Sequence, residues 1–195
     1  MINVIKDSIK ALIVATLLTI IYTLVVTMIG QAFFNKQANG SILTIHNRSI
    51  GSKLIAQPFT EKKYLWGRNM IIDTNLFKTS KGQTILYASA SNLSQTSTQL
   101  IRQVRNRAAI IKKLNPGENN VPIDLVTTSG SGLDPEISPQ AAFYQAKRIA
   151  RARDISIKKV NKIIKNNIVE KTYGIFGENR VNVLEVNIAL DRISK

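Results

Sequence analysis

The sequence predicts an α+β soluble domain anchored by one N-terminal transmembrane helix. Three observations predict it: a long uncharged apolar run near the N-terminus, apolar residues at helical spacing in the second half of the chain, and short β-rich runs between them. The 195 residues suffice for one compact domain with an appendage. We expect a short cytoplasmic N-terminus over residues 1–10, a transmembrane helix over 11–32, and a soluble α/β-mixed extracytoplasmic domain over 33–195.

The run Ala11–Gly30 contains no charged residue, and the uncharged stretch extends from after Lys10 to before Lys36. About 20 helical residues at ~1.5 Å each span the roughly 30 Å hydrocarbon core of a bilayer. A cleaved signal peptide is the alternative, because Lys6 and Lys10 precede the run and small residues follow it. The run exceeds the roughly 7–15 apolar residues of a signal peptide, so we interpret it as a membrane anchor.

Basic residues flank the apolar run on both sides, Lys6 and Lys10 before it and Lys36 and Arg48 after it. The positive-inside bias is therefore small, and large domains translocate largely regardless of charge. We expect the N-terminus in the cytoplasm and the domain outside. The absence of cysteine is compatible with either compartment.

The chain is strongly basic, with 27 Lys and Arg against 12 Asp and Glu and a formal net charge of +15. Such a charge is typical of proteins that bind nucleic acid, an anionic membrane surface or an acidic partner. A domain that is anchored in a membrane already lies beside anionic head groups. The membrane therefore accounts for the sign of the charge, and we expect no nucleic acid as partner.

Short strands and turns are predicted between the anchor and residue 97. A turn-rich neck lies near Asn39–Ser41, and IGSKLIAQPF (50–59) predicts a short strand followed by a turn. A further strand is predicted at Thr84–Ala88. We interpret Trp66, in KYLWGR, as a packing anchor.

A helix is predicted to begin at Ser97 or Thr98 and to stop at Pro116 and Gly117, and Val121–Thr127 predicts a short strand after it. Apolar residues recur on one face of this helix and arginines cover the other: Leu100, Val104, Ala108 and Ile111 on the apolar face, and Arg102, Arg105 and Arg107 on the outer face.

Another helix is predicted to begin at Ser138 and Pro139, because Ser accepts hydrogen bonds from the first free amides and Pro suits the first helical position. It continues to Arg153, and Ser156–Ile168 predicts a second helix. The chain closes with VNVLEVNIALD (181–191), in which every second residue is apolar, as a strand requires. The alternating apolar positions are Leu184, Val186, Ile188 and Leu190.

The loop TTSGSGLDPEIS (127–138) is rich in glycine and serine, as many phosphate-binding loops are. It has neither GxxxxGK[ST] nor GxGxxG spacing, and Asp134 and Glu136 would repel a phosphate. A shaped connection fits better, because Gly130 and Gly132 can take positive φ and Asp134-Pro135 favours an extended or turn conformation. Shaped loops often bind a partner.

Enzyme chemistry is not expected. A nucleophilic Ser129 or Ser131 needs a base within hydrogen-bond reach, and the single histidine, His46, lies far away in the sequence. A lysine base stays formally open, although neither serine has SxxK spacing. One histidine and no cysteine give no metal-ligand cluster, so we expect no metal.

The run VPIDLVTTSGSGLDPEISPQAAFYQAKRIARAR (121–153) resembles the signature of the C subunit of the Kdp potassium-transporting P-type ATPase. The N-terminal span, GSKLIAQPF, YLWGR and GENRVNVLEVNIALD agree in the same order, so the resemblance covers nearly the whole chain. Asn69 stands where the family usually has proline, and alanines replace glycines before Ser91, which argues against a nucleotide-binding signature there. The positions that the resemblance marks as partner contacts or family motif are Gly51, Gln57, Trp66, Gly67, Arg68, Ser91, Asn92, Leu93, Ser129, Gly130, Ser131, Gly132, Leu133, Asp134, Pro135, Ser138, Pro139, Gln145, Arg148, Arg151, Asn182 and Asn187.

The resemblance implies a non-catalytic accessory subunit in a complex with a potassium-translocating subunit, an ATP-hydrolysing subunit and a small membrane peptide. It implies no cofactor on this chain, and ATP only through the ATP-hydrolysing subunit. We expect the domain to stabilise assembly and to cover the outer mouth of the potassium-translocating subunit. The alternative is the catalytic chaperone role credited to the family, in which a ternary complex with ATP raises the affinity of the hydrolysing subunit; that role requires a cytoplasmic domain. Two other classes stay open, a membrane-anchored basic nucleic-acid-binding or pilin-like protein and a membrane-anchored hydrolase.

Overall fold

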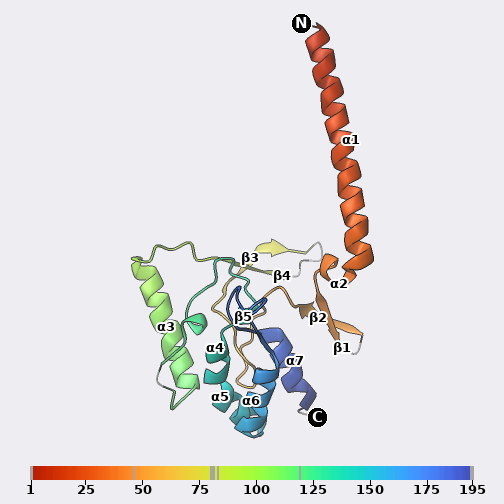
Figure 1. The fold of residues 1–195 in the computed structure, drawn as a ribbon. Coiled ribbons are helices and arrows are strands. Elements are labelled where there is room, and N and C mark those ends of the chain that lie inside the picture. Colours follow the sequence, from red (N-terminus) through yellow and green to blue (C-terminus); the bar gives the residue numbers. More distant parts are fainter. Residues whose placement is uncertain (1, 46, 80–81, 83, 119, 194–195) are drawn as a thin grey trace. The chain divides into compact units, whose positions relative to one another are not determined.

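The computed structural model describes residues 2–45, 47–79, 82, 84–118 and 120–193, with the side chains of 73–78 and 84–86 outside that description. The chain forms two compact units, Met1–Ser52 and Lys53–Lys195 (Figure 1). Helix and sheet are both present in the described chain, so the mixed fold class predicted from the sequence is confirmed.

The first unit begins with α1 (Ile2–Phe33), a 32-residue helix whose described side chains are almost all exposed. It extends the predicted span Ala11–Gly30 at both ends and is long and apolar enough to cross a membrane. The hydroxyls of Thr16, Thr19 and Thr23 each donate to the carbonyl four residues earlier, at 2.8 Å. These hydroxyls are therefore satisfied within the helix, as an apolar surrounding requires.

A short hairpin completes the first unit. After α2 (Asn35–Ala38), β1 (Ile42–Ile45) pairs antiparallel with β2 (Arg48–Ser52), with a bulge between Leu43 and Thr44. The predicted strand near residue 50 is confirmed as β2. His46 lies outside the described residues.

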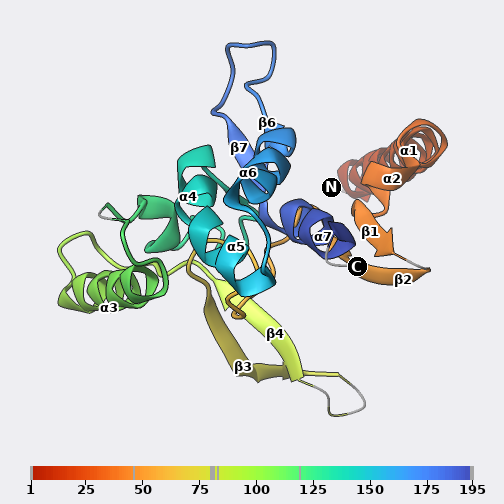
Figure 2. The ribbon, with the colours of Figure 1, turned by 90° about the horizontal axis from the view of Figure 1, so that it is seen from below.

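The second unit opens with an antiparallel pair, β3 (Ile71–Lys78) and β4 (Thr84–Ser89), followed by α3 (Thr98–Leu114) and the 3-10 turn η1 (Ile123–Leu125). A three-stranded antiparallel sheet has the order β5-β7-β6, formed by Glu136–Ile137, Arg180–Asn182 and Ile168–Val169. Four further helices belong to the second unit and lie beside this sheet (Figure 2): α4 (Pro139–Tyr144), α5 (Ala146–Arg153), α6 (Ile157–Asn166) and α7 (Val183–Ile193).

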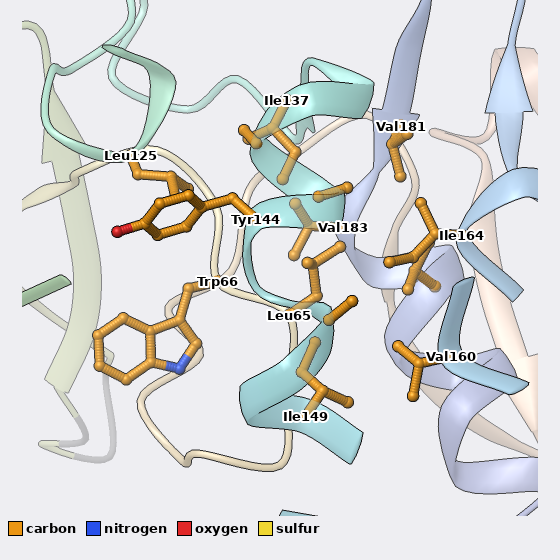
Figure 3. Packing of buried hydrophobic residues seen from close by; sticks show 14 of the residues in the cluster. Leu65, Trp66, Leu125, Ile137, Tyr144, Ile149, Val160, Ile164, Val181 and Val183 are labelled. Atoms are coloured by element: carbon orange, nitrogen blue, oxygen red, sulfur yellow. The ribbon is translucent and has the colours of Figure 1, made fainter. Parts of the chain in front are cut away.

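The hydrophobic core of the second unit lies between these helices, the sheet and the segment that precedes β3 (Figure 3). Leu65 and Trp66 enter it from that segment, while Ile149 comes from α5 and Ile164 from α6. Trp66 is only 8% exposed, so its interpretation as a packing anchor is confirmed. The core therefore fixes the 53–70 segment against helices that are far from it in the sequence.

Three serines cap helices, and two of these caps, Ser97 and Ser138, were predicted from the local sequence. Ser97 accepts from the amide of Leu100, Ser138 from that of Ala141, and the hydroxyl of Ser156 caps α6 in the same way. The predicted strand at Thr84–Ala88 is also confirmed, as β4.

The predicted C-terminal strand is wrong, because 183–193 is the helix α7. Asn182 ends β7 and caps α7, since its Oδ1 accepts from the amide of Glu185 at 3.1 Å. The side chains of Val183, Val186 and Leu190 are buried at three- and four-residue spacing, which is the helical period. The apolar residues of this segment fit both the two-residue period of a strand and the helical period, and the structure has the helix.

Two further expectations are corrected. The predicted strand at Val121–Thr127 is the short turn η1, because Asp124 and Leu125 both turn inward and are buried. The predicted helix from Pro139 to Arg153 is divided at Gln145, which separates α4 from α5. The side chain of Gln145 is completely buried there, so the break has a structural use.

Candidate functional site

The 53–70 segment is held in place by two side-chain amides, Gln145 and Asn187, which we call the amide clamp. Gln145 Oε1 accepts from the backbone N–H of Trp66 at 2.9 Å, and its Nε2 donates to the carbonyl of Trp66 at 2.9 Å. Asn187 does the same for Leu65, at 2.7 Å to the N–H and 3.0 Å to the carbonyl. The clamp thereby satisfies the buried backbone groups of two residues that belong to no strand.

Arg148 extends the clamp. It is buried, and its guanidinium donates to the carbonyl of Lys62 at 2.6 Å, to Asn115 Oδ1 at 3.2 Å and to Gln145 Oε1 at 2.6 Å. Burial lowers the pKa of Arg148 to about 10. Arg148 therefore ties the end of α3 and the 53–70 segment to α5.

The guanidinium groups of Arg107 and Arg148 lie over the indole ring of Trp66, with each Cζ 5.2 Å from the ring centroid. Arg107 also donates to the carbonyl of Leu125 at 3.1 Å, and burial lowers its pKa. The expectation that Arg107 shares the outer face of α3 with Arg102 and Arg105 is wrong, because Arg107 faces the core while the other two are exposed.

Arg68 bridges two carboxylates from segments that are distant in the sequence. Its Nε lies 2.9 Å from Asp134 Oδ2, and a terminal nitrogen lies 3.1 Å from Asp124 Oδ1. The second oxygen of each carboxylate accepts a backbone amide, from Glu136 and Ser138 respectively, both at 2.9 Å. This ion-pair bridge fixes the glycine-rich loop to the YLWGR segment.

The glycine-rich loop itself is internally bonded. Ser129 Oγ accepts from the amide of Asp134 at 3.3 Å, and Ser131 Oγ accepts from that of Leu133 at 3.1 Å. The two hydroxyls also lie 3.3 Å apart. Both serines thus shape the connection that the sequence predicted.

Of the two glycines expected to take positive φ in this loop, only Gly132 does, with φ +74°. Gly132 lies directly against the carbonyl group of Ser89, where a Cβ would overlap with backbone atoms. Gly130 is exposed and has open space around its Cα. The loop therefore needs one glycine for close packing, and it packs on the end of β4.

The remaining predicted residues occupy several separate places. The carbonyl of Pro135 accepts from the amide of Val183 at 3.0 Å, and Asn182 Nδ2 donates to the carbonyl of Lys53 at 2.8 Å. The others do not gather at one point: Gly51 on β2 in the first unit, Gln57 and Gly67 along a small cavity beside Arg68, Ser91, Asn92 and Leu93 in the loop after β4, Pro139 at the start of α4, and Arg151 on the surface of α5.

A basic cavity of about 340 Å³ lies between the C-terminal ends of α3 and α5. Glu118 also lines the cavity, and it pairs with Lys147 at 2.7 Å. The basic side chains that line the cavity have a structural role, because the C-terminal end of a helix attracts cations. Their surplus of positive charge also suits an anionic ligand. The basic residues that line the cavity are Lys62, Lys113, Lys147, Arg148 and Arg151.

Sequence reasoning missed Asn115 and Lys62 as members of this region. Asn115 is 3% exposed and orients Arg148, and its only local signal is its position before the Pro116 helix stop. Lys62 contributes its backbone carbonyl to Arg148, which no side-chain pattern could reveal. Across the described residues no group of three His, Cys, Asp or Glu side chains could hold a metal ion.

The fold and the site define a class of protein: a small α+β domain, held together by buried polar side chains, that follows one helix apolar enough to cross a membrane. The family model of the K+-transporting ATPase, c chain, matches residues 5–192. The potassium-transporting ATPase KdpC subunit of Clostridium perfringens is 47% identical over 194 residues, which are 98% of each chain. That of Clostridium botulinum is 46% identical over 95% of this chain and 96% of the relative, and that of Methylococcus capsulatus is 40% identical over 99% and 100%.

The chain therefore belongs to the family of KdpC subunits of the potassium-transporting Kdp ATPase. The resemblance drawn from the sequence is confirmed. As a subunit of that complex, the chain has the other Kdp subunits as partners.

Proposed function

We propose that this chain is a non-catalytic accessory subunit that stabilises the potassium-transporting complex and covers the outer mouth of the potassium-translocating subunit. The observation that supports this proposal best is that side chains of the family motif bind other groups of the same domain. Gln145 and Asn187 form hydrogen bonds with its backbone, and Arg68 pairs with its carboxylates. Such side chains build a rigid body that can bind a partner, whereas a catalytic cleft would leave reactive groups open to a substrate.

The anchor supports this role. Helix α1 carries apolar side chains around its whole circumference, so it suits both lipid and the transmembrane helices of a partner subunit. We propose that α1 packs against the potassium-translocating subunit, with its N-terminus in the cytoplasm and the domain outside the cell. A domain placed there cannot reach cytoplasmic ATP.

Cysteine labelling tests this topology, because the chain contains no cysteine. Asn120→Cys places a thiol on an exposed residue of the domain, beside Asn119, which lies outside the described residues. Ser8→Cys is the matched control on the other flank of the apolar run. A membrane-impermeant maleimide on intact cells should label Asn120→Cys and leave Ser8→Cys unlabelled until lysis; the reverse pattern would overturn the proposed topology.

The covering role needs a second test in the assembled complex. A chain that ends after Ser52 retains α1 but lacks the Lys53–Lys195 unit. If the domain stabilises assembly, the shortened chain should yield a complex that dissociates more readily in detergent and takes up less potassium at low external concentration. Unchanged stability and uptake would show that the domain has another role.

A second candidate function is the catalytic chaperone, which raises the ATP affinity of the hydrolysing subunit. The basic cavity beside Arg151 and Lys113 favours it, since its charge suits phosphate groups. Two results together would favour the chaperone role over the covering role. Asn120→Cys would be labelled only after lysis, and the complex with Lys113→Gln/Arg151→Gln would have a raised KM for ATP. Labelling on intact cells and an unchanged KM would support the covering role.

A further inference from the structure

The connection between β6 and β7 exposes three large apolar side chains at its end, Tyr173, Ile175 and Phe176. They are 88%, 75% and 66% exposed, and Tyr173 is the most exposed large apolar residue among the described side chains. The connection projects beyond the helices of its own unit (Figure 2). We call these three residues the apolar tip. Side chains of this kind gain nothing for folding when they remain in water.

The apolar tip is held in a defined conformation. Thr172 and Phe176 form a β-bridge, with backbone hydrogen bonds of 2.9 and 3.0 Å in the two directions. The amide of Ile175 donates to the carbonyl of Thr172 at 3.2 Å, which closes a four-residue turn. The apolar side chains are therefore presented by an ordered turn.

The turn carries an unfavourable residue at its first central position. Tyr173 has φ +55° and Gly174 has φ +73°, as in a type I′ turn. Asn-Gly is preferred in this turn, and a bulky aromatic residue in the left-handed region is strained. The turn thus keeps an aromatic side chain where local stability favours asparagine, which points to a use outside the fold.

The charges beside the apolar tip favour a protein over a lipid surface. Lys171 pairs with Glu178 at 3.4 Å, and Arg180 pairs with Glu136 at 3.0 Å. Glu170 is exposed as well, so the hairpin carries no surplus of positive charge in a chain whose net charge is +15. An anionic bilayer attracts basic segments, whereas apolar residues within a polar and charge-balanced rim are typical of protein interfaces.

We propose that the apolar tip docks into an apolar socket on the outer face of the potassium-translocating subunit, with Glu170 and Glu178 against hydrogen-bond donors or cations at the rim of the socket. The proposal rests on the covering role and names the element that makes the contact. A turn with two or three buried anchors in one pocket is the arrangement in which few residues supply most of the binding energy.

The test uses the full chain within the assembled complex. Tyr173→Asn removes the aromatic ring and places the preferred residue in the turn, so it should leave the chain as stable as before or more stable. Phe176→Ser removes a second anchor. Each should weaken retention of the chain by the potassium-translocating subunit roughly tenfold or more. Ile123→Ser is the matched control, because Ile123 is 71% exposed but lies in η1.

Retention unchanged by Tyr173→Asn and Phe176→Ser, or lowered equally by Ile123→Ser, would overturn the proposal. A photoreactive residue identifies the occupant: Phe176→benzoylphenylalanine should cross-link to the potassium-translocating subunit. Cross-links to phosphatidylglycerol, to the ATP-hydrolysing subunit or to a second copy of the chain would overturn it. Labelling of Asn120→Cys on intact cells distinguishes a failure of this proposal from a failure of the covering role. If the domain is labelled outside the cell but Phe176→benzoylphenylalanine gives no cross-link to the potassium-translocating subunit, only the proposed contact of the apolar tip is contradicted. If the domain lies inside the cell, the covering role is contradicted as well.

Discussion

Gln145 binds both backbone polar groups of Trp66, with its Oε1 at 2.9 Å from the N–H and its Nε2 at 2.9 Å from the carbonyl. The two residues are 79 positions apart, and both are buried. Because Gln145 also accepts from Arg148 and donates to the carbonyl of Ala141, one side chain joins the 53–70 segment to α4 and α5.

We expect Gln145→Leu to lower the free energy of unfolding by about 3 kcal/mol or more, because it leaves the N–H and carbonyl of Trp66 buried without partners. Thermal unfolding of the full chain in detergent measures this. Gln140→Leu is the control, since Gln140 is exposed on α4, which ends just before Gln145, and its substitution should change stability little. Equal effects of the two substitutions would show that the clamp does not hold the segment.

We expect Arg68→Met to destabilise the domain by about 2 kcal/mol, since it leaves Asp124 and Asp134 without their shared cation. The figure is below that of a fully buried pair because the Arg68 side chain is 24% exposed. Arg68→Lys should recover only part of the loss, because an ammonium lacks the planar fork that reaches both carboxylates. Denaturant unfolding of the three chains tests this order, and full recovery by Lys would contradict it.

We expect Gly132→Ala to destabilise the domain by roughly 2–4 kcal/mol, through the left-handed backbone and the overlap of the new Cβ with the carbonyl of Ser89. Gly130→Ala, two residues away, should be tolerated because a Cβ added there would meet no other atom within 4 Å. Expression level and Tm of the two variants give the comparison. A Gly132→Ala chain with unchanged Tm would mean that the loop does not pack on β4.

Tyr144 gives a prediction with a pH dependence. Its buried hydroxyl has no hydrogen-bond partner within the described residues, so Tyr144→Phe should be neutral or should stabilise by up to about 1 kcal/mol. Burial, with a smaller contribution from the charge of Glu118, raises the pKa of Tyr144 above 10.0. The folded chain then keeps a proton that the unfolded chain loses, and this stabilisation is complete below pH 10 and is lost as the pH rises through the folded pKa.

The Tyr144→Phe chain lacks that alkaline loss, so its advantage in Tm should grow between about pH 8 and about pH 11. Tyr64→Phe is the contrasting variant, because the hydroxyl of Tyr64 donates to Asp191 at 3.2 Å. It should cost about 0.5–1 kcal/mol at neutral pH. A destabilised Tyr144→Phe chain would reveal a partner for its hydroxyl.

Signals that depend on a few neighbouring residues could be predicted from the sequence. The apolar run of α1 needs only its composition, and the caps at Ser97 and Ser138 need only a hydroxyl before a helix. The family could be identified for the same reason, since contiguous segments carry it. The shaped character of the glycine-rich loop also followed from local conformational preferences.

Tertiary structure alone decided the features that depend on residues far apart in the sequence. The segment 183–193 has apolar residues compatible with two periods, and the helix is selected because Asn187 must turn inward to bind Leu65. The break at Gln145 arises because its amide satisfies Trp66, and Arg107 leaves the outer face of α3 to reach Leu125. A buried polar group must find a partner wherever the fold supplies one, and that partner is not encoded in the neighbouring residues.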